Sequence, residues 1–406
     1  MHIVFIAHFA GSPQHGMVFG HYYLAREWVR SGHHVTIIAA AFAHTRFRQP
    51  HVTRQIVEEH IDGVRFLWIP TPTYTPSDRV GRVRNILTFV KRVWTKNLPI
   101  QKADLVIASS HHPFAIHPSR YLANRMNARL VFEVRDLWPL TLIELGGAST
   151  KNPFIRLMQY SEDYAYQHAD HVVSVLPAAK DYMIMHGMRP DKFTYIPNGV
   201  DLDEVVQSEP LPGEYVDLIE GLRSKGKFLV GYAGRIGLAN ALHTLVDAVK
   251  LCSSDNVNIV IMGEGSHVSE LQSQAKKNGV ANKIHFLTSV PKPQVHDFLT
   301  RMDCVYIGLQ SQPLFRFGVS PTKLNDYMLS AKPIIYAINT PHNEVEESRA
   351  GITCQAEDAL DIAKAISVMC TMSKNELVDM GRCGYDWIIK NKNYRVLAER
   401  FLKVLT

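Results

Sequence analysis

The chain has 406 residues, more than one ordinary hydrophobic core accommodates, so its length predicts two domains. Its composition, 46% hydrophobic and 20% charged, excludes a disordered or low-complexity chain and is typical of a soluble globular protein. A net charge of +6 favours acidic partners such as phosphorylated substrates or anionic lipid, and no apolar run reaches the roughly 18 to 20 residues that span a bilayer.

Strand and helix patterns alternate through the first half of the chain. The apolar segment at 2–7 has neither a basic leader nor a cleavage site, so we interpret it as a buried strand of a cytoplasmic protein. A hairpin is predicted at 52–69, around the turn signal Asp62-Gly63. Further strands are expected at 34–40, 104–108, 129–134 and 171–175, with helices between them. This alternation predicts a parallel sheet covered by helices.

A basic amphipathic helix is predicted at 79–96. Wound at about 3.6 residues per turn, its apolar side chains fall largely on one side and most of its cations on the other. The cations are Arg79, Arg82, Arg84, Lys91, Arg92 and Lys96. The pattern fits a domain helix with a solvated basic rim, and it also fits a helix on a membrane surface. The aromatic side chains of Phe89 and Trp94 favour lipid.

The turn signal at 196–200 ends the first alternation and predicts a hinge. A second alternation follows. Its strands are expected at 228–232, 257–262, 283–287, 303–308 and 333–337. We therefore predict an α/β protein with two Rossmann-like, doubly wound parallel-sheet domains, 1–198 and 199–384, facing an interdomain cleft. By periodicity alone, the last helix, 385–406, fits either domain.

Residues 318–332 predict a glycine turn followed by a helix whose amino end can hold an anion. Ser320 is a suitable N-cap, and Pro321 suits the first helical position. The next backbone N–H groups stay unpaired, so with the helix dipole and the Lys323 ammonium they favour a phosphate or diphosphate. Asp326, one turn further on, can reach sugar hydroxyls. The segment also fits an ordinary capped helix with a solvated lysine and aspartate.

Two glycine-rich turns follow strands of the second domain. The first, at 231–237, lets backbone N–H groups and Arg235 approach phosphate oxygens, although a tight connection with a solvated arginine fits as well. The second, at 263–266, places Glu264 near the expected cleft. Neither these turns nor the loop at 11–20 has the full G-x-G-x-x-G pattern, so a nicotinamide enzyme is disfavoured.

Charged residues end an apolar strand of the first domain. Glu133, Arg135 and Asp136 lie at its carboxyl end. They predict either a salt bridge between Arg135 and Asp136, or a site in which Arg135 meets an anion and Asp136 orients an acceptor hydroxyl. His112, before Pro113, can also touch substrate. The histidines match no metal signature and the five cysteines are expected to be reduced thiols, so no metal site is predicted.

Several motifs, taken in order, resemble those of glycosyltransferase family 4, which has the GT-B fold. They are Gly234-Arg235, Met262-Gly-Glu-Gly265, Ile284-His-Phe-Leu-Thr-Ser-Val-Pro291 and Ser320-Pro-Thr-Lys-Leu-Asn-Asp-Tyr327. Two further segments, Val134-Arg-Asp-Leu-Trp-Pro139 and Ile196-Pro-Asn-Gly-Val-Asp201, make the chain look closest to the WbuB-like branch, bacterial transferases of O-antigen and capsule assembly. The resemblance spans essentially the whole chain.

The resemblance implies a hexosyltransferase-type enzyme that moves a sugar from a uridine diphosphate (UDP) sugar with retention of configuration and without an obligatory metal. The implied sugar is an N-acetylated hexosamine or a deoxyhexosamine. Catalytic roles would belong to Arg135, Asp136, Lys323 and Arg235, the last two neutralising the leaving diphosphate. Donor contacts would come from Gly16, Gly20, Gly234, Arg235, Gly263, Glu264, Phe286, Leu287, Val319, Ser320, Pro321, Thr322, Lys323 and Asp326. The acceptor would contact Glu133 and His112.

The implied acceptor is a saccharide linked to a lipid, polyprenyl diphosphate, in bacterial surface polysaccharide synthesis. By the same resemblance the first domain binds the acceptor, the second binds the nucleotide sugar, and the helix 385–406 returns to the first. The enzyme would lie peripherally on the inner face of the cytoplasmic membrane through 79–96. Nucleic acid is not an expected partner.

The chain departs from the family pattern at three positions. Gly318 stands where many relatives have the first of two glutamates, Arg135 where they have a histidine, and Asn240 where they have a phosphate-binding lysine. Lys323 can supply that missing cation. A GT-B nucleotide-sugar epimerase remains an alternative function, and the missing glutamate also leaves open an inactive, membrane-binding partner of another transferase.

Overall fold

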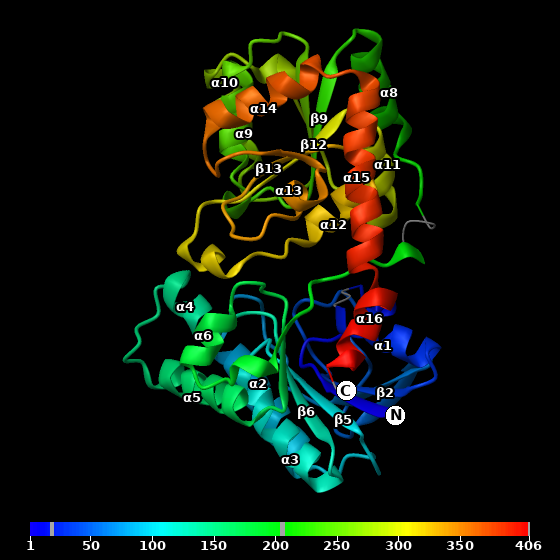
Figure 1. Ribbon diagram of the computed structural model, residues 1–406, viewed down its shortest axis with the longest axis vertical. Helices are drawn as coiled ribbons and strands as arrows, with labels where there is room; N and C mark the ends of the chain where they lie inside the picture. The colour runs from blue at the N-terminus through cyan, green and yellow to red at the C-terminus, as the bar shows by residue number, and fades with distance from the viewer. Residues whose placement is uncertain (17–19, 204–207, 405–406) are drawn as a thin grey trace. The chain divides into compact units, whose positions relative to one another are not determined.

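The computed structural model describes residues 1–16, 20–203 and 208–404, and the chain separates into two compact units (Figure 1). The first unit comprises Met1–Gly199 and Tyr394–Thr406, and the second comprises Val200–Asn393. Each unit has its own sheet and its own clusters of buried apolar side chains. The first unit therefore takes its last helix from the opposite end of the chain.

The described part of the first unit contains an eight-stranded sheet in the order β3-β4-β2-β1-β5-β6-β7-β8. The strands are β1 (His2–Ile6), β2 (His34–Ala40), β3 (Val57–Ile61), β4 (Val64–Ile69), β5 (Leu105–Ser109), β6 (Arg129–Val134), β7 (His171–Ser174) and β8 (Phe193–Tyr195). Neighbouring strands are parallel except for the β3–β4 hairpin, so the predicted parallel architecture is confirmed.

The hairpin begins later than its sequence pattern predicts. Its turn residues, Asp62 and Gly63, both have positive φ, and the register pairs Ile61 with Val64 and Val57 with Trp68. Because β4 ends at residue 69, residues before 56 have no facing strand to pair with, so the expected start at 52 is wrong.

Helices cover the faces of this sheet. They are α1 (Gly20–Arg30), α2 (Arg79–Thr95), α3 (Ile116–Met126), α4 (Leu140–Glu144), α5 (Pro153–His168), α6 (Lys180–Met185) and α16 (Tyr394–Lys403). The basic helix predicted at 79–96 is α2, which begins where the Asp78 side chain accepts a hydrogen bond from the Gly81 N–H. Phe89, Val90 and Val93 form its buried face.

The second unit contains, in its described residues, a six-stranded parallel sheet ordered β11-β10-β9-β12-β13-β14. Its strands are β9 (Phe228–Ala233), β10 (Val257–Met262), β11 (Ile284–Leu287), β12 (Cys304–Gly308), β13 (Ile334–Ala337) and β14 (Gly351–Thr353). Its helices are α8 (Gly213–Ser224), α9 (Leu242–Leu251), α10 (Val268–Lys277), α11 (Lys292–Thr300), α12 (Thr322–Leu329), α13 (Glu344–Ser348), α14 (Ala359–Thr371) and α15 (Lys374–Lys392). The strand and helix alternation predicted here is confirmed.

The chain ends in two helices rather than in the single helix expected at 385–406. α15 starts earlier, at a capping box formed by Ser373 and Glu376, and belongs to the second unit. The extended residue Asn393 interrupts the helix, and α16 follows in the first unit (Figure 1). Among the described residues, no helix has both the length and the apolar character needed to cross a membrane.

α16 completes the core of the first unit by packing against α1. The Trp28 Nε1 donates a hydrogen bond of 3.0 Å to the Ala398 carbonyl, and Phe401 lies edge-on to the Trp28 ring. Tyr394 stacks on Tyr23, with ring centres 4.7 Å apart. These contacts bury apolar and aromatic surface that α1 would otherwise expose.

Candidate active site

In the second unit, the turns that follow β9 and β10 pack backbone against backbone. Gly234 and Gly263 have φ values of +148° and +152°, and a Cβ on Gly263 would lie 1.9 Å from the Gly234 carbonyl oxygen. The Gly234 N–H bonds to the Met262 carbonyl, and the Gly263 N–H bonds to the Leu287 carbonyl, both at 3.0 Å. Only glycine meets both the steric and the dihedral demand, so these positions have a structural reason to lack a side chain.

The Lys323 side chain of α12 lies across the first of these turns. A Cβ on Gly234 would come within 2.8 Å of the Lys323 Cδ. The Lys323 amine donates hydrogen bonds to the Tyr232 hydroxyl, at 2.9 Å, and to the Asn240 side-chain carbonyl. Burial lowers the pKa of Lys323 to about 8, because water is kept from the charged form. The amine is thus fixed at Asn240, the position at which relatives are expected to carry a lysine.

The amino end of α12 differs from the predicted cap by one residue. Pro321 is itself the N-cap, with extended dihedrals of −70° and 119°, and the helix begins at Thr322, so the prediction of Ser320 as N-cap is wrong. The extended ψ of Pro321 keeps it out of the first helical turn. The backbone N–H groups of Thr322 and Lys323 still have no partner within the helix, by the geometry of a helix start.

The other residues predicted to bind the donor lie around the same turns. Arg235 is exposed, and its backbone carbonyl accepts hydrogen bonds from the side chains of Tyr232 and Asn240. Glu264 is also exposed, and it accepts a hydrogen bond of 2.6 Å from the Ser289 hydroxyl. The structure therefore brings Lys323, Gly234, Gly263 and the Arg235 backbone together at the ends of β9 and β10.

Four more predicted donor residues lie on neighbouring elements. Phe286 and Leu287 end β11, beside β10. Val319 precedes the N-cap of α12, and Asp326 lies one turn after Lys323 on a half-buried part of that helix. Such a spacing places Asp326 and Lys323 on the same side of α12.

Gly318 stands in a backbone conformation that a glutamate would not adopt readily. Its φ is 97° and its ψ is 165°, and it ends the 3-10 helix Pro313–Phe317. L side chains are strained at such a positive φ. The chain therefore departs from the family pattern at this position in its backbone conformation as well as in the missing side chain.

In the first unit, the carboxyl end of β6 holds a buried, hydrogen-bonded carboxylate. Glu133 is 3% exposed, and its two oxygens bond to the His21 Nε2 at 2.9 Å and to the Arg135 guanidinium at 3.2 Å. Burial by itself would raise the pKa of Glu133, but His21, Arg135 and a hydrogen bond from Ser109 hold it below its usual value. Burial also lowers the pKa of His21, which favours its neutral form. The Arg135 guanidinium is therefore the positive charge that compensates Glu133.

Arg135 is fixed by residues other than Asp136. Its guanidinium also donates to the Asn198 side chain at 2.6 Å, and its backbone N–H donates to the Ser110 hydroxyl at 2.9 Å. In the described structure Arg135 thus pairs with Glu133, and the alternative of an Arg135–Asp136 salt bridge is wrong. Burial raises the pKa of Asp136 to about 6, and the positive charge of Arg135 opposes this rise. The Asp136 side chain is nevertheless exposed, so water screens part of the influence of burial.

His112 belongs to a buried chain of neutral side chains. Its Nε2 lies 3.2 Å from the His8 Nδ1, and the His8 Nε2 lies 2.7 Å from the Asn85 side-chain oxygen. Burial lowers the pKa of His112 to about 3 and that of His8 well below its usual value, so neither carries charge near neutral pH. Among the described atoms, the His112 Nδ1 is buried without a hydrogen-bond partner.

The two glycines predicted in the first loop have different surroundings. Gly16 has a φ of 73° and ends a 3-10 helix, Pro13–His15, and a Cβ there would meet the Phe47 ring at 2.4 Å. Gly20 opens α1, and a Cβ there would lie 3.7 Å from the Arg135 guanidinium. Residues 17–19, between them, lie outside the described residues.

Four residues of these sites carry contacts that the sequence patterns did not single out. Tyr232 binds the Lys323 amine, His21 and Ser109 surround Glu133, and Asn198 binds Arg135. A charged residue in an apolar strand such as β6 signals that partners must exist, since a buried charge is costly without them. Which residues supply them depends on the fold.

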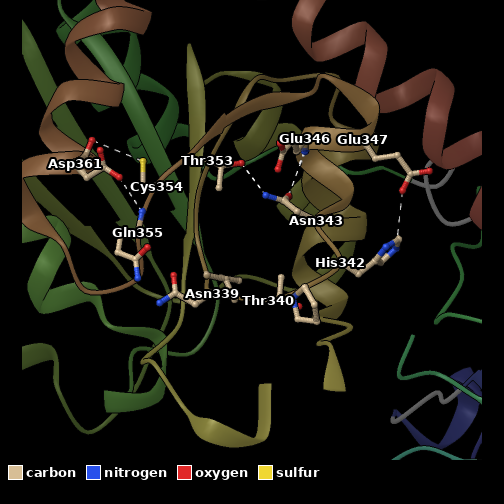
Figure 2. A pocket seen from close by; sticks show the side chains of 12 residues that line it. Asn339, Thr340, His342, Asn343, Glu346, Glu347, Thr353, Cys354, Gln355 and Asp361 are labelled. Atoms are coloured by element: carbon tan, nitrogen blue, oxygen red, sulfur yellow. Dashed lines mark hydrogen bonds and ion pairs between the residues drawn. The ribbon is translucent and has the colours of Figure 1, made fainter. Parts of the chain in front are cut away.

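An open hollow of the second unit lies away from these residues. It measures about 600 Å³ beside the ends of β13 and β14, and no residue predicted to bind donor or acceptor lines it. Figure 2 shows Asn343 turned toward Thr353, to which it donates a hydrogen bond of 2.8 Å, while the Asn343 oxygen caps α13. Asn339 accepts a hydrogen bond from the Ala356 N–H. Asn339 and Asn343 thus already have partners within the unit. We assign the hollow no role in binding.

No group of three or more histidine, cysteine, aspartate or glutamate side chains among the described residues could hold a metal ion. The five cysteines are free thiols, as their spacing predicts.

Two family models match the chain and together account for most of it. The Glycosyl transferase 4-like domain matches residues 16–199, and Glycosyl transferases group 1 matches residues 218–387. Two separate sheets of largely parallel strands, each with helices on its faces, are typical of the GT-B class of fold. The chain is a glycosyltransferase of GT-B fold, and it belongs to glycosyltransferase family 4.

Two relatives and one solved structure resemble the chain at low sequence identity. The probable glycosyltransferase WbjE of Pseudomonas aeruginosa is 21% identical over 280 residues, 68% of each chain. The putative colanic acid biosynthesis glycosyl transferase WcaI of Escherichia coli K12 is 20% identical over 270 residues, 64% of this chain and 65% of that protein. The structure of Anabaena HepE in complex with UDP and glucose has a TM-score of 0.63 at 16% identity, covering 100% of this chain and 99% of that one. The predicted fold and enzyme class are thus confirmed.

The buried amine of Lys323 should titrate far below an ordinary lysine. Since burial lowers its pKa to about 8, the charged fraction should fall as pH rises from 7 to 9. In spectra of the protein with ¹³C-labelled lysine, one side-chain resonance should titrate in this range and should be missing from Lys323→Arg. A Lys323 resonance that titrates only above pH 10 would contradict the buried position.

Proposed function

We propose that the chain transfers a sugar, with retention of configuration, from a UDP-sugar to a lipid-linked saccharide in bacterial surface polysaccharide synthesis. The observation that carries this proposal is the Lys323 amine, held over the β9 turn at the start of α12. The UDP bound to HepE and the colanic acid role in the name of WcaI support it. The donor sugar is proposed to be an N-acetylated hexosamine or a deoxyhexosamine, and the WbuB-like branch stays a prediction.

In the proposed donor site, the diphosphate meets Lys323, Arg235 and the backbone at the start of α12. An ammonium has three N–H donors, and Tyr232 and Asn240 engage two of them. The third can bind a phosphate oxygen, and the N–H groups of Thr322 and Lys323 add the positive end of the helix dipole. As the bond from the sugar to the diphosphate breaks, these groups stabilise the charge that collects on the leaving UDP.

Other parts of the donor are assigned by the family resemblance. Asp326 would bind the ribose, and Phe286 and Leu287 would frame the base. Gly16 and Gly20 would lie against the diphosphate and the sugar. No metal is required in this scheme, because the cation and the helix provide the positive charge.

In the proposed acceptor site, Asp136 accepts the hydrogen bond of the attacking hydroxyl. Its raised pKa suits a group that shares a proton with that hydroxyl near neutral pH. Arg135, held by Glu133 and Asn198, fixes the position of the segment. The His112 Nδ1, which has no hydrogen-bond partner among the described atoms, would bind a further acceptor hydroxyl. The first unit is thus proposed to bind the acceptor and the second unit to bind the donor.

The proposed contact with the inner face of the cytoplasmic membrane lies on α2 and the helices beside it. Val80, Leu87 and Trp94, seven residues apart, are 79%, 45% and 47% exposed, and the exposed cations Arg84 and Lys91 alternate with them. α2 and α3 contain no acidic residue. Exposed aromatic and basic side chains in one stripe suit an anionic bilayer surface.

The donor assignment can be tested with variants of the two cations. Lys323→Ala and Arg235→Ala should each weaken UDP binding in calorimetry by about tenfold or more, about 1.4 kcal/mol or more, because each removes a charge-assisted hydrogen bond to phosphate. The matched control is Lys250→Ala, which removes an exposed lysine of α9 from the same unit. Unchanged UDP affinity in both variants would sink the assignment.

The reaction can be tested with a panel of nucleotide sugars. A UDP-sugar that binds tightly should raise the melting temperature in proportion to the logarithm of its saturation, and N-acetylated hexosamine donors should raise it most. Transfer to a lipid-linked acceptor is then followed by mass spectrometry. A new nucleotide sugar formed without an acceptor would show the epimerase alternative to be correct.

The membrane contact can be tested with vesicles of phosphatidylglycerol at low salt. Replacing Arg84, Lys91 and Lys96 with alanine should weaken binding by about 1 kcal/mol for each cation removed. The control replaces three exposed lysines of the second unit, Lys250, Lys276 and Lys374. Equal vesicle binding by both triple variants would rule out this surface.

A further inference from the structure

A buried carboxylate of α5 binds the backbone of the segment that carries Arg135 and Asp136. Glu162 is 2% exposed, and its Oε1 accepts hydrogen bonds from the Trp138 backbone N–H at 2.9 Å and from the Tyr166 hydroxyl at 3.1 Å. Its Oε2 accepts from the Tyr182 hydroxyl at 3.1 Å and from the Gln159 amide at 3.3 Å. One side chain of α5 thus joins α6 to the segment after β6.

All four partners can donate to the Glu162 oxygens, so they stabilise its ionised form. A carboxylate has two oxygens with about four acceptor sites, and the Trp138 N–H and the Gln159 amide nitrogen can only donate. Burial nevertheless raises the pKa of Glu162 to about 8 against the hydrogen bonds from Tyr182, Tyr166 and Trp138. Holding this group charged is therefore costly, and an apolar side chain could join α5 to α6 without that cost.

The hydrogen bond from the Trp138 N–H to Glu162 lies two residues after Asp136. The segment after β6 is held at one end by the Arg135 N–H, which donates to the Ser110 hydroxyl, and at the other by the Trp138 N–H. Asp136 lies between these two anchors with its side chain exposed, and Leu137 is buried beside it. Two backbone hydrogen bonds to side chains of other elements therefore define where Asp136 stands.

We propose that Glu162 is a positioning residue for sugar transfer, which fixes the Trp138 backbone and thereby holds Asp136 in place for the acceptor hydroxyl. The inference rests on the proposed function, because it is the role of Asp136 that gives the hydrogen bond to Trp138 its purpose. Glu162 does not touch substrate. Misplacement of a reacting group by about 1 Å can cost about 100-fold in rate. A side chain that does not touch substrate can therefore control turnover by fixing the position of Asp136.

The test compares three variants of this cluster. Glu162→Ala leaves the Trp138 N–H without its acceptor, and kcat should fall by about 10- to 100-fold with an unchanged KM for the donor. Glu162→Gln keeps a carbonyl oxygen for Trp138 and should restore kcat to near the wild-type value. Tyr182→Phe is the matched control, since it removes a hydrogen bond to the other oxygen. It should lower the melting temperature and leave kcat unchanged.

A double-mutant cycle separates positioning from a purely structural role. In an Asp136→Asn background, Glu162→Ala should have little further effect on kcat, because the side chain that it positions no longer accepts the proton. Equal effects of Glu162→Ala in both backgrounds, or a kcat that Glu162→Ala does not change, would overturn the inference.

Amide exchange provides a readout that does not depend on activity. The Trp138 N–H should exchange faster in Glu162→Ala than in the wild type, and Glu162→Gln should restore its protection. Unchanged protection in Glu162→Ala would overturn the inference even if the proposed reaction proved wrong. A wild-type protein that transfers no sugar to any acceptor would instead count against the proposed function alone.

Discussion

The close approach of the turns after β9 and β10 sets the geometry of the second unit's site. A Cβ on Gly263 would overlap the Gly234 carbonyl, and Gly234 itself has a φ of +148°, so the two strand ends meet only with glycine at both positions. The bare backbone at Gly234 then leaves room for the Lys323 side chain, which crosses it to reach Tyr232 and Asn240. The position of the Lys323 amine therefore follows from a steric fit between main chains. It differs in this from the amine of a flexible lysine at the surface.

In the first unit, the buried charge of Glu133 determines the geometry of the carboxyl end of β6. Glu133 joins α1 to β6 through His21, and it fixes Arg135, which in turn reaches Asn198. Breaking such a network by removing one partner leaves a charge buried and unpaired, which costs about 3 to 5 kcal/mol. The network therefore holds the carboxyl end of β6 rigid, and the exposed carboxylate of Asp136 gains a defined position from it.

The sequence predicts what depends on local patterns and misses what depends on the fold. Apolar runs give the strands and a turn signal gives the hairpin, but the hairpin's length depends on where β4 ends. The helix after Gly318 is predicted, yet its cap shifts by one residue because Pro321 is extended. The bond between Lys323 and Asn240 joins residues 83 positions apart, and that between Glu133 and His21 joins residues 112 apart. No periodicity carries such pairings.

Each unit's proposed site has one buried or half-buried cation, Arg135 in the first and Lys323 in the second, and the two differ in the counter-charge beside them. The charge of Arg135 is compensated by Glu133, so this guanidinium has little to gain from a second anion, and the interpretation that Arg135 meets an anion loses support. The side chains that bind the Lys323 amine, Tyr232 and Asn240, are neutral, and burial lowers its pKa to about 8. Among the described residues this amine has no ion pair, and a diphosphate would supply a counter-charge whose attraction offsets the cost of keeping the amine charged away from water. Electrostatics therefore supports the proposal that Lys323 binds the anion and that Arg135 orients the segment that holds Asp136.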